Sequence, residues 1–206
     1  MVLQTVYDEA DGVTIVVFRS SELKEVGWLG PLYDMINNAF ATGQKELNPG
    51  NTRFKAPSEI PEALGEAGIC AVAFKDGYKD IPVATAAMKP WKGVHVGFED
   101  SVIVELNESL QKSGAFAVDW ELSSVAVSSQ FPKRGLASRC ITVLEQQLRQ
   151  TVQNNSTQLW VIATYLVENY WKNHGYREVA STVAPKGTWC AVKPFRLVVM
   201  KGPLRQ

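Results

Sequence analysis

Residues 120–145 constrain this chain most, because they join two different periodicities across one short turn. The first part is built of small and β-branched residues that alternate with a period of two, which is typical of a strand. The last part predicts an amphipathic helix from Gly135 to about Gln153. Its apolar face consists of Leu136, Ala137, Cys140, Ile141, Leu144 and Leu148.

The turn between these parts is basic and contains Gly135. A helix that begins there offers free N–H groups and a positive dipole end to an anion, and diphosphate is the ligand that such a site predicts. The stretch therefore predicts a strand, a phosphate loop and a helix. A basic turn that only begins a surface helix is the simpler alternative.

The register of this stretch resembles the acetyl-CoA motif of the GNAT acyltransferases. That motif is Val-x-Val, a short turn, and then Gln/Arg-x-x-Gly-x-Gly/Ala. Here valines stand at 125 and 127, and the last part consists of Pro132, Lys133, Arg134, Gly135, Leu136 and Ala137. Pro132 replaces the family's Gln or Arg and removes one side-chain donor and one backbone N–H. Lys133 and Arg134 are candidates to compensate.

A second motif lies near the C-terminus. Residues 165–176, YLVENYWKNHGY, resemble the family's helix that ends in Leu-Tyr-x-x-x-Gly-Phe, with Gly175 as the stop. The closing segment PKGTWCAVKPFRLVVMKG is similar to small GNAT proteins of filamentous fungi. The resemblance implies one GNAT domain over residues 1–206 with an α/β fold and a long insertion at about 91–114. We expect a mixed central sheet of about six to seven strands, with a splayed parallel pair and flanking helices.

The remaining elements follow from apolar runs and turn signals. The predicted strands are 13–18, 69–74, 82–88, 115–127, 159–163, 177–182 and 195–200, and further helices are predicted at 31–42 and 58–65. Strands 69–74 and 82–88 form an antiparallel hairpin, and strand 115–127 pairs in parallel with 159–163 through a helical crossover. The polar segment 43–57 is expected to be a loop that is free to reach the substrate.

Composition excludes several classes of partner. With 46% hydrophobic residues in 206, the chain can bury one core. Its 21 basic and 21 acidic side chains give zero formal charge, which argues against nucleic acid and anionic membranes. The chain has no apolar stretch of spanning length and an acidic N-terminus, which predicts a cytoplasmic protein. The sequence leaves both a monomer and a homodimer open. Three cysteines without ligand spacing and two histidines predict buried thiols and no metal site.

The resemblance implies that acetyl-CoA or another acyl-CoA binds between the 115–127 and 159–163 strands and acylates a small-molecule acceptor. Pantetheine amides can pair with the backbone of Val125 and Val127, and an N–H near Val125 can bind the developing oxyanion. Gly135 and Ala137 keep the loop small, and Ser138 adds a hydroxyl. The candidate cofactor-binding residues are Val125, Ala126, Val127, Lys133, Arg134, Gly135, Leu136, Ala137, Ser138 and Trp171.

Glu121 is the candidate general base. It lies on the central strand where several family members carry a catalytic Glu, and enclosure in a sheet is expected to raise its pKa. The structural alternative is an ion pair with a neighbouring Lys or Arg at a strand edge. Asp119 lies on the same side of the strand and is a second candidate.

The general acid is the point at which the chain departs from the family pattern. The family's Tyr position holds Trp171, whose indole N–H cannot transfer a proton. Tyr170, about a hundred degrees round the helix, and His174, one turn on, are the candidates. Their structural alternatives are a core aromatic and a residue at the negative end of the helix dipole. Water-mediated transfer and an unassisted thiolate also stay open.

Two function classes therefore follow. The first is an acyl-CoA-dependent N-acyltransferase that acts on a small molecule, with an amine acceptor preferred over a hydroxyl. The second is a repurposed GNAT scaffold with different chemistry or non-catalytic acyl-CoA binding, which Pro132 and Trp171 favour. A structural interaction protein would show no CoA affinity.

Overall fold

The computed structural model describes residues 4–8, 12–47, 53–76, 80–152 and 156–205. The chain divides into two compact units, which are described separately. The first unit comprises Met1–Gly43, Gly50–Lys89 and Leu122–Thr151, and the second comprises Gln44–Pro49, Pro90–Glu121 and Val152–Gln206. Strand β5 (Trp120–Val127) contributes residues to both units.

The first unit is a sheet covered by helices. Its strands follow the order β1-β2-β3-β4-β5. They are β1 (Gln4–Asp8), β2 (Val13–Arg19), β3 (Ile69–Lys75), β4 (Pro82–Pro90) and β5. The first three pairings are antiparallel, and β3 and β4 form the predicted hairpin.

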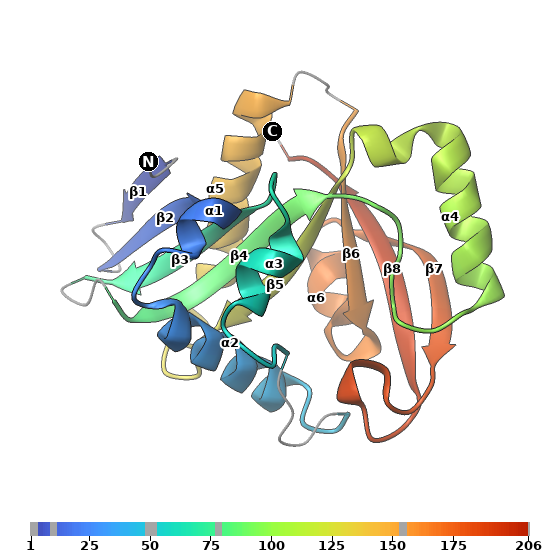
Figure 1. The fold of residues 1–206 in the computed structure, drawn as a ribbon, viewed down its shortest axis with the longest axis horizontal. Helices are drawn as coiled ribbons and strands as arrows, with labels where there is room; N and C mark the ends of the chain where they lie inside the picture. Colours follow the sequence, from blue (N-terminus) through green and yellow to red (C-terminus); the bar gives the residue numbers. More distant parts are fainter. Residues whose placement is uncertain (1–3, 9–11, 48–52, 77–79, 153–155, 206) are drawn as a thin grey trace. The chain divides into compact units, whose positions relative to one another are not determined.

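Strand β3 is buried on both faces, which its unbroken apolar run predicts. Cys70, Val72 and Phe74 join a core cluster with Leu32 and Ile36 of helix α2 (Leu29–Gly43). The alternate residues of β3 face the other way. Helices α2 and α3 (Glu59–Leu64) lie in front of the sheet in Figure 1, and α5 (Leu136–Thr151) lies behind it. The short helix α1 (Ser20–Leu23) continues directly from β2.

The second unit contains the parallel pair. Residues Trp120 and Glu121 of β5 pair with Leu159 and Trp160 of strand β6 (Gln158–Thr164). The parallel ladder between the described residues of β5 and β6 consists of these two pairs. Antiparallel strands β8 (Phe195–Pro203) and β7 (Arg177–Ala184) complete the order β6-β8-β7.

Helix α4 (Ser101–Ser113) lies in the predicted insertion. Asp100 caps it by accepting hydrogen bonds from Val102 N and Ile103 N, and it also accepts one from Thr182 Oγ1 of β7 at 2.6 Å. Ile103 and Leu110 of α4 share a core cluster with Leu197 and Val199 of β8. The insertion is therefore part of the core of its unit.

The structure confirms the α/β fold class with its mixed sheet and flanking helices, and it corrects several bounds. The described residues form eight strands, whereas about six to seven were predicted. The additional strand is β1, which carries too little apolar signal to be predicted. The expected strand 115–127 begins only at Trp120, since Gly114 ends α4 in a left-handed conformation and Ala115–Ala117 form a 3-10 turn. The expected helix 165–176 consists of a 3-10 turn, Tyr165–Val167, and helix α6 (Glu168–Asn173). In the parts of the chain that the structure describes, no helix combines the length and the apolarity that a membrane crossing requires.

The loop expected over residues 43–57 is partly fixed. Residues 48–52 lie outside the described part of the chain. The Asn37 side chain of α2 accepts a hydrogen bond from Phe54 N at 2.9 Å and donates one to Phe54 O at 3.1 Å. Tyr33 Oη donates to Lys55 O. Residues 53–55 are therefore pinned to α2 and are not the free loop that we expected.

Candidate functional site

The β5–α5 turn, residues 128–135, lies in the first unit. Ser128 N donates to Val83 O of β4 at 2.8 Å, and Phe131 N donates to Ser128 O at 2.9 Å. Helix α5 then begins at Leu136, and Arg139 N donates to Gly135 O at 3.0 Å. The first N–H groups of any α-helix have no acceptor within the helix, so this turn leads directly to a row of backbone donors.

The backbone of the turn has the alternation that forms an anion-binding nest. Lys133 has φ of 59° and Gly135 has φ of 68°, whereas Arg134 between them is not in the positive-φ region. Successive residues of opposite hand direct their N–H groups into one concavity. A Cβ on Gly135 would meet no atom within 4 Å, so there is space for a side chain at this position. Glycine is favoured here because the backbone is left-handed.

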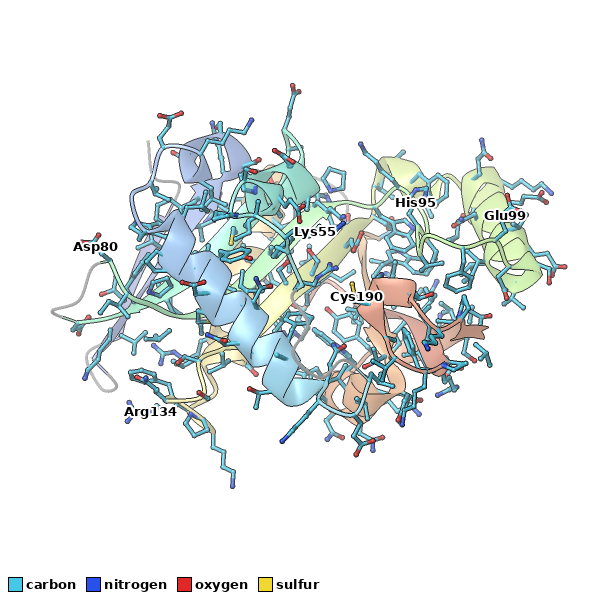
Figure 2. All side chains as sticks on the ribbon, turned by 60° about the horizontal axis from the view of Figure 1, so that its bottom comes forward. Lys55, Asp80, His95, Glu99, Arg134 and Cys190 are labelled. Carbon is cyan, nitrogen blue, oxygen red and sulfur yellow. The ribbon has the colours of Figure 1, made fainter. Side chains whose placement is uncertain are left out.

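Phe131, which no sequence pattern indicated, lies close to two cations beside this turn. The Arg134 guanidinium lies 5.3 Å from the centre of the Phe131 ring, and Lys75 Nζ of β3 lies 6.0 Å from it. Figure 2 shows Arg134 on this turn. Together with exposed Lys133 and the positive end of α5, these groups make an electropositive surface that favours a polyanion.

Strand β5 contains a conformational irregularity three residues after Glu121. Ser124 has φ of 49°, which a non-glycine residue rarely adopts inside a strand. A left-handed residue interrupts the regular ladder and redirects the neighbouring peptide groups. The N–H of Val125, which we expected to bind an oxyanion, belongs to one of these peptides. Strained residues of this kind cluster at functional sites.

Glu121 and Asp119 have different surroundings in the second unit. Glu121 is half-buried and stands opposite Trp160 in the parallel ladder. Asp119 is 5% exposed, and both of its carboxylate oxygens accept hydrogen bonds, from Gln158 N at 3.0 Å and from Trp160 Nε1 at 2.7 Å. Both carboxylate oxygens of Asp119 are thus engaged in the structure.

Helix α6 brings the two candidate acids together. The Tyr170 and His174 rings lie 4.2 Å apart, and His174 Nδ1 is 2.8 Å from Tyr170 O. Trp171 is buried and packs edge-on against Tyr170 and Tyr176. Gly175 N donates to Lys172 O and Tyr176 N to Trp171 O, which confirms that the helix stops at Gly175.

An ion-pair network ties α6 to the two outer strands. Arg196 of β8 contacts Glu168 of α6 and Glu178 of β7, both at 2.5 Å, and Lys172 also pairs with Glu168. Hydrogen bonds first from Lys172 and then from Arg196 lower the pKa of Glu168. The hydrogen bonds that Arg196 donates to Glu178 and Glu168 raise the pKa of Arg196, and the bond to Glu178 is the larger cause. The network holds in place the helix that carries Tyr170 and His174.

The cysteines only partly match the expectation of buried thiols. Burial raises the pKa of Cys70 to about 11 and also raises the pKa of Cys140. Cys190, by contrast, is exposed on the turn between β7 and β8 (Figure 2). Among the described residues, no group of three or more His, Cys, Asp or Glu side chains can hold a metal ion.

No protein-family model matches the chain, and no curated protein sequence matches it. Solved structures do match, and three are representative.

FeeM, an N-acyl amino acid synthase from uncultured soil microbes, aligns with a TM-score of 0.60 at 10% identity and covers 92% of this chain and 91% of its own. An acetyltransferase of the GNAT family from Desulfovibrio desulfuricans aligns with a TM-score of 0.54 at 11% identity, and the alignment covers 93% of this chain and 99% of the other. An aminoglycoside 6'-N-acetyltransferase complexed with coenzyme A aligns with a TM-score of 0.50 at 12% identity, and the alignment covers 84% of this chain and 91% of the other. These likenesses establish the GNAT fold. Nothing in them supports the expected similarity to fungal proteins.

Proposed function

We propose that this chain is an acyl-CoA-dependent N-acyltransferase that moves an acyl group, acetyl in the first instance, directly to the amine of a small molecule. The observation that carries the proposal is the β5–α5 turn, whose alternating backbone at Lys133 and Gly135 precedes a helix N-terminus on a GNAT fold. A backbone nest, clustered cations and little side-chain bulk fit the diphosphate of CoA.

The proposed CoA contacts come from backbone more than from side chains. N–H groups of Gly135, Leu136, Ala137 and Ser138 face the diphosphate, while Lys133 and Arg134 supply positive charge in place of the donor that Pro132 removes. Val125, Ala126 and Val127 offer strand backbone to the pantetheine amides. The left-handed Ser124 supports this assignment because a residue of this conformation redirects the neighbouring peptide groups of a strand.

In the proposed chemistry the acceptor amine reacts in its neutral form, and the Glu121 carboxylate takes the proton that the nitrogen loses as the C–N bond forms. The amine nitrogen attacks the thioester carbonyl carbon, the C–N bond forms, and the C–S bond breaks. The N–H of Val125 stabilises negative charge on the carbonyl oxygen. The departing thiolate takes a proton from Tyr170, from His174 or from water.

The structural neighbours support an amine-bearing small molecule as the acceptor. The name of one refers to N-acetylation of an aminoglycoside and that of another to synthesis of N-acyl amino acids, so both names describe acylation of nitrogen on a small molecule. Zero formal net charge in this chain fits such an acceptor better than it fits a polyanionic one.

Glu121→Gln tests the proposal. Removal of a general base should lower kcat by about a hundredfold, with the Kd for acetyl-CoA unchanged. Glu105→Gln on the exposed side of α4 is the matched control, and it should leave both constants unchanged. A parallel fall in kcat and acetyl-CoA affinity in Glu121→Gln would instead assign Glu121 a structural role.

The second candidate is a scaffold with altered chemistry. Trp171 is buried at the position of the family's Tyr, which favours this candidate. It predicts release of free CoA without an acylated product across amine and hydroxyl acceptors, detected by mass spectrometry. Formation of any acylated amine in proportion to the CoA released would exclude it.

A further inference from the structure

We infer that Asp119 is a positioning residue that fixes Glu121 through Trp160. This inference rests on the proposed function, because it concerns the residue that we assign as the base. Asp119, Glu121 and Trp160 all belong to the second unit, so their arrangement is internal to that unit.

The Asp119 carboxylate closes a clasp between the start of β5 and the start of β6. Oδ2 accepts a hydrogen bond from the Trp160 indole at 2.7 Å, and Oδ1 accepts one from Gln158 N at 3.0 Å. The backbone of Asp119 adds a third bond, because its carbonyl accepts from Trp91 N at 2.9 Å. One residue therefore joins β5 to two residues of β6 and to the segment that follows β4.

The Trp160 ring is held firmly in place. The Trp91 ring stacks on it, with centroids 4.8 Å apart and an interplanar angle of 8°. Both side chains are almost completely buried, and Lys201 Nζ lies 5.4 Å from the Trp160 ring centre. The indole N–H of Trp91 has no partner among the described residues, whereas that of Trp160 is used by Asp119. The stack fixes the plane of Trp160, and Asp119 fixes the direction of its edge.

A carboxylate is a costly way to satisfy two neutral N–H groups. Burial of a charged group is unfavourable unless it is well paired, and a neutral acceptor would serve a purely structural contact at a lower desolvation cost. The carboxylate provides two equivalent acceptor oxygens, so that both donors are held at once and in one geometry. This arrangement specifies position more than it adds stability.

The clasp lies where it controls Glu121. The β5–β6 ladder consists of Trp120 opposite Leu159 and Glu121 opposite Trp160, and Asp119 directly precedes it. So short a ladder contributes few backbone hydrogen bonds, and the two bonds that Asp119 accepts from Gln158 and Trp160 add to the fixing of this register. A displacement of about 1 Å at a catalytic group can lower the rate about a hundredfold. Asp119 therefore supports the rate through Glu121 and does not exchange a proton itself.

Asp119→Asn tests the inference. The amide that it introduces presents N–H groups toward one of the two donors, so one bond becomes repulsive while the size of the side chain is kept. We expect kcat to fall about 10- to 100-fold, with the Kd for acetyl-CoA within about twofold of wild type. Asp100→Asn is the matched control, since Asp100 also accepts from two backbone N–H groups and one side chain in the same unit. It should lower stability and leave kcat unchanged.

The double variant Asp119→Asn/Trp160→Phe separates positioning from simple damage. Trp160→Phe removes the indole donor, so the amide introduced by Asp119→Asn no longer faces that N–H. The combined loss in kcat should then be smaller than the product of the two single losses. If Trp160→Phe does not fold, the single variant Asp119→Asn tests the inference alone, by whether kcat falls while the Kd for acetyl-CoA stays near the wild-type value.

Two results overturn the inference. Asp119→Asn that lowers only thermal stability, as Asp100→Asn does, would make the clasp merely structural. A kcat loss in the double variant equal to the product of the two single losses would show that Asp119 acts independently of Trp160. If the wild-type protein transfers no acyl group to any acceptor, the proposed function fails and the inference fails with it, whereas transfer that Asp119→Asn leaves intact refutes the inference alone.

Discussion

Gly135→Ala is the smallest change that tests the β5–α5 turn. Gly135 has φ of 68°, and a Cβ at this position would meet no atom within 4 Å. The substitution therefore introduces no clash, and its effect comes from the backbone. An L-residue in this left-handed conformation costs about 1–2 kcal/mol.

The chain has two ways to respond to that cost. Either the turn keeps its conformation and unfolding becomes easier by about 1–2 kcal/mol, or φ relaxes to negative values and the nest is lost. Relaxation misdirects the N–H groups that would meet the diphosphate, and each lost charge-assisted hydrogen bond is worth about 1.5–3 kcal/mol. The Kd for acetyl-CoA should then rise about 10- to 100-fold, because 1.4 kcal/mol corresponds to about a factor of ten.

Equilibrium dialysis with labelled acetyl-CoA and thermal unfolding measure the two effects on the same samples. The control is Gly114→Ala, because Gly114 has φ of 73° at the end of α4 and its added Cβ also meets no atom within 4 Å. It should lose a similar amount of stability and keep its acetyl-CoA affinity. Gly135→Glu, which also adds negative charge beside Lys133 and Arg134, should abolish binding. Unchanged affinity in a folded Gly135→Glu protein would refute the assignment of this turn.

Three further predictions concern the second unit. Tyr170→Phe should lower kcat about a hundredfold with acyl-CoA binding intact, because only the hydroxyl is removed; a similar loss in His174→Gln alone would make His174 the acid. Cys190 is exposed, so a thiol reagent should modify one cysteine per native chain, and modification that persists in Cys190→Ser would contradict the burial of the other two. Arg196→Gln should destabilise by no more than about 1 kcal/mol at pH 7. The pKa of Glu168 in the folded state is below its ordinary 4.5, so the stability that its ion pairs contribute is present above 4.5 and is lost as pH falls through the folded pKa. The urea midpoints of Arg196→Gln and wild type should therefore converge in acid.

The sequence was most informative where local patterns decide structure. The hairpin of β3 and β4, helix α5 and the stop at Gly175 all follow from residues close together in the chain, and the structure confirms them. Strand β1 has a mixed polar composition, and its existence depends on pairing with β2. Propensity alone could not predict it.

The details of the candidate site depended on contacts that no local pattern contains. Asp119 reaches Gln158 and Trp160 across 39 and 41 residues, and Phe131 meets Lys75 of a distant strand. The left-handed conformation of Ser124 was also unpredictable, since serine carries no strong signal for it. The small polar pair Ser123–Ser124, between Leu122 and Val125, was the only hint.

Titration calorimetry of the wild-type protein with acetyl-CoA tests the central claim most directly. The predicted result is saturable binding of one acetyl-CoA per chain that weakens with added salt, because the turn contributes positive charge, and that weakens in Gly135→Ala. The contradictory result is the absence of both binding heat and thermal stabilisation at millimolar acetyl-CoA, in a protein whose unfolding transition shows that it is folded.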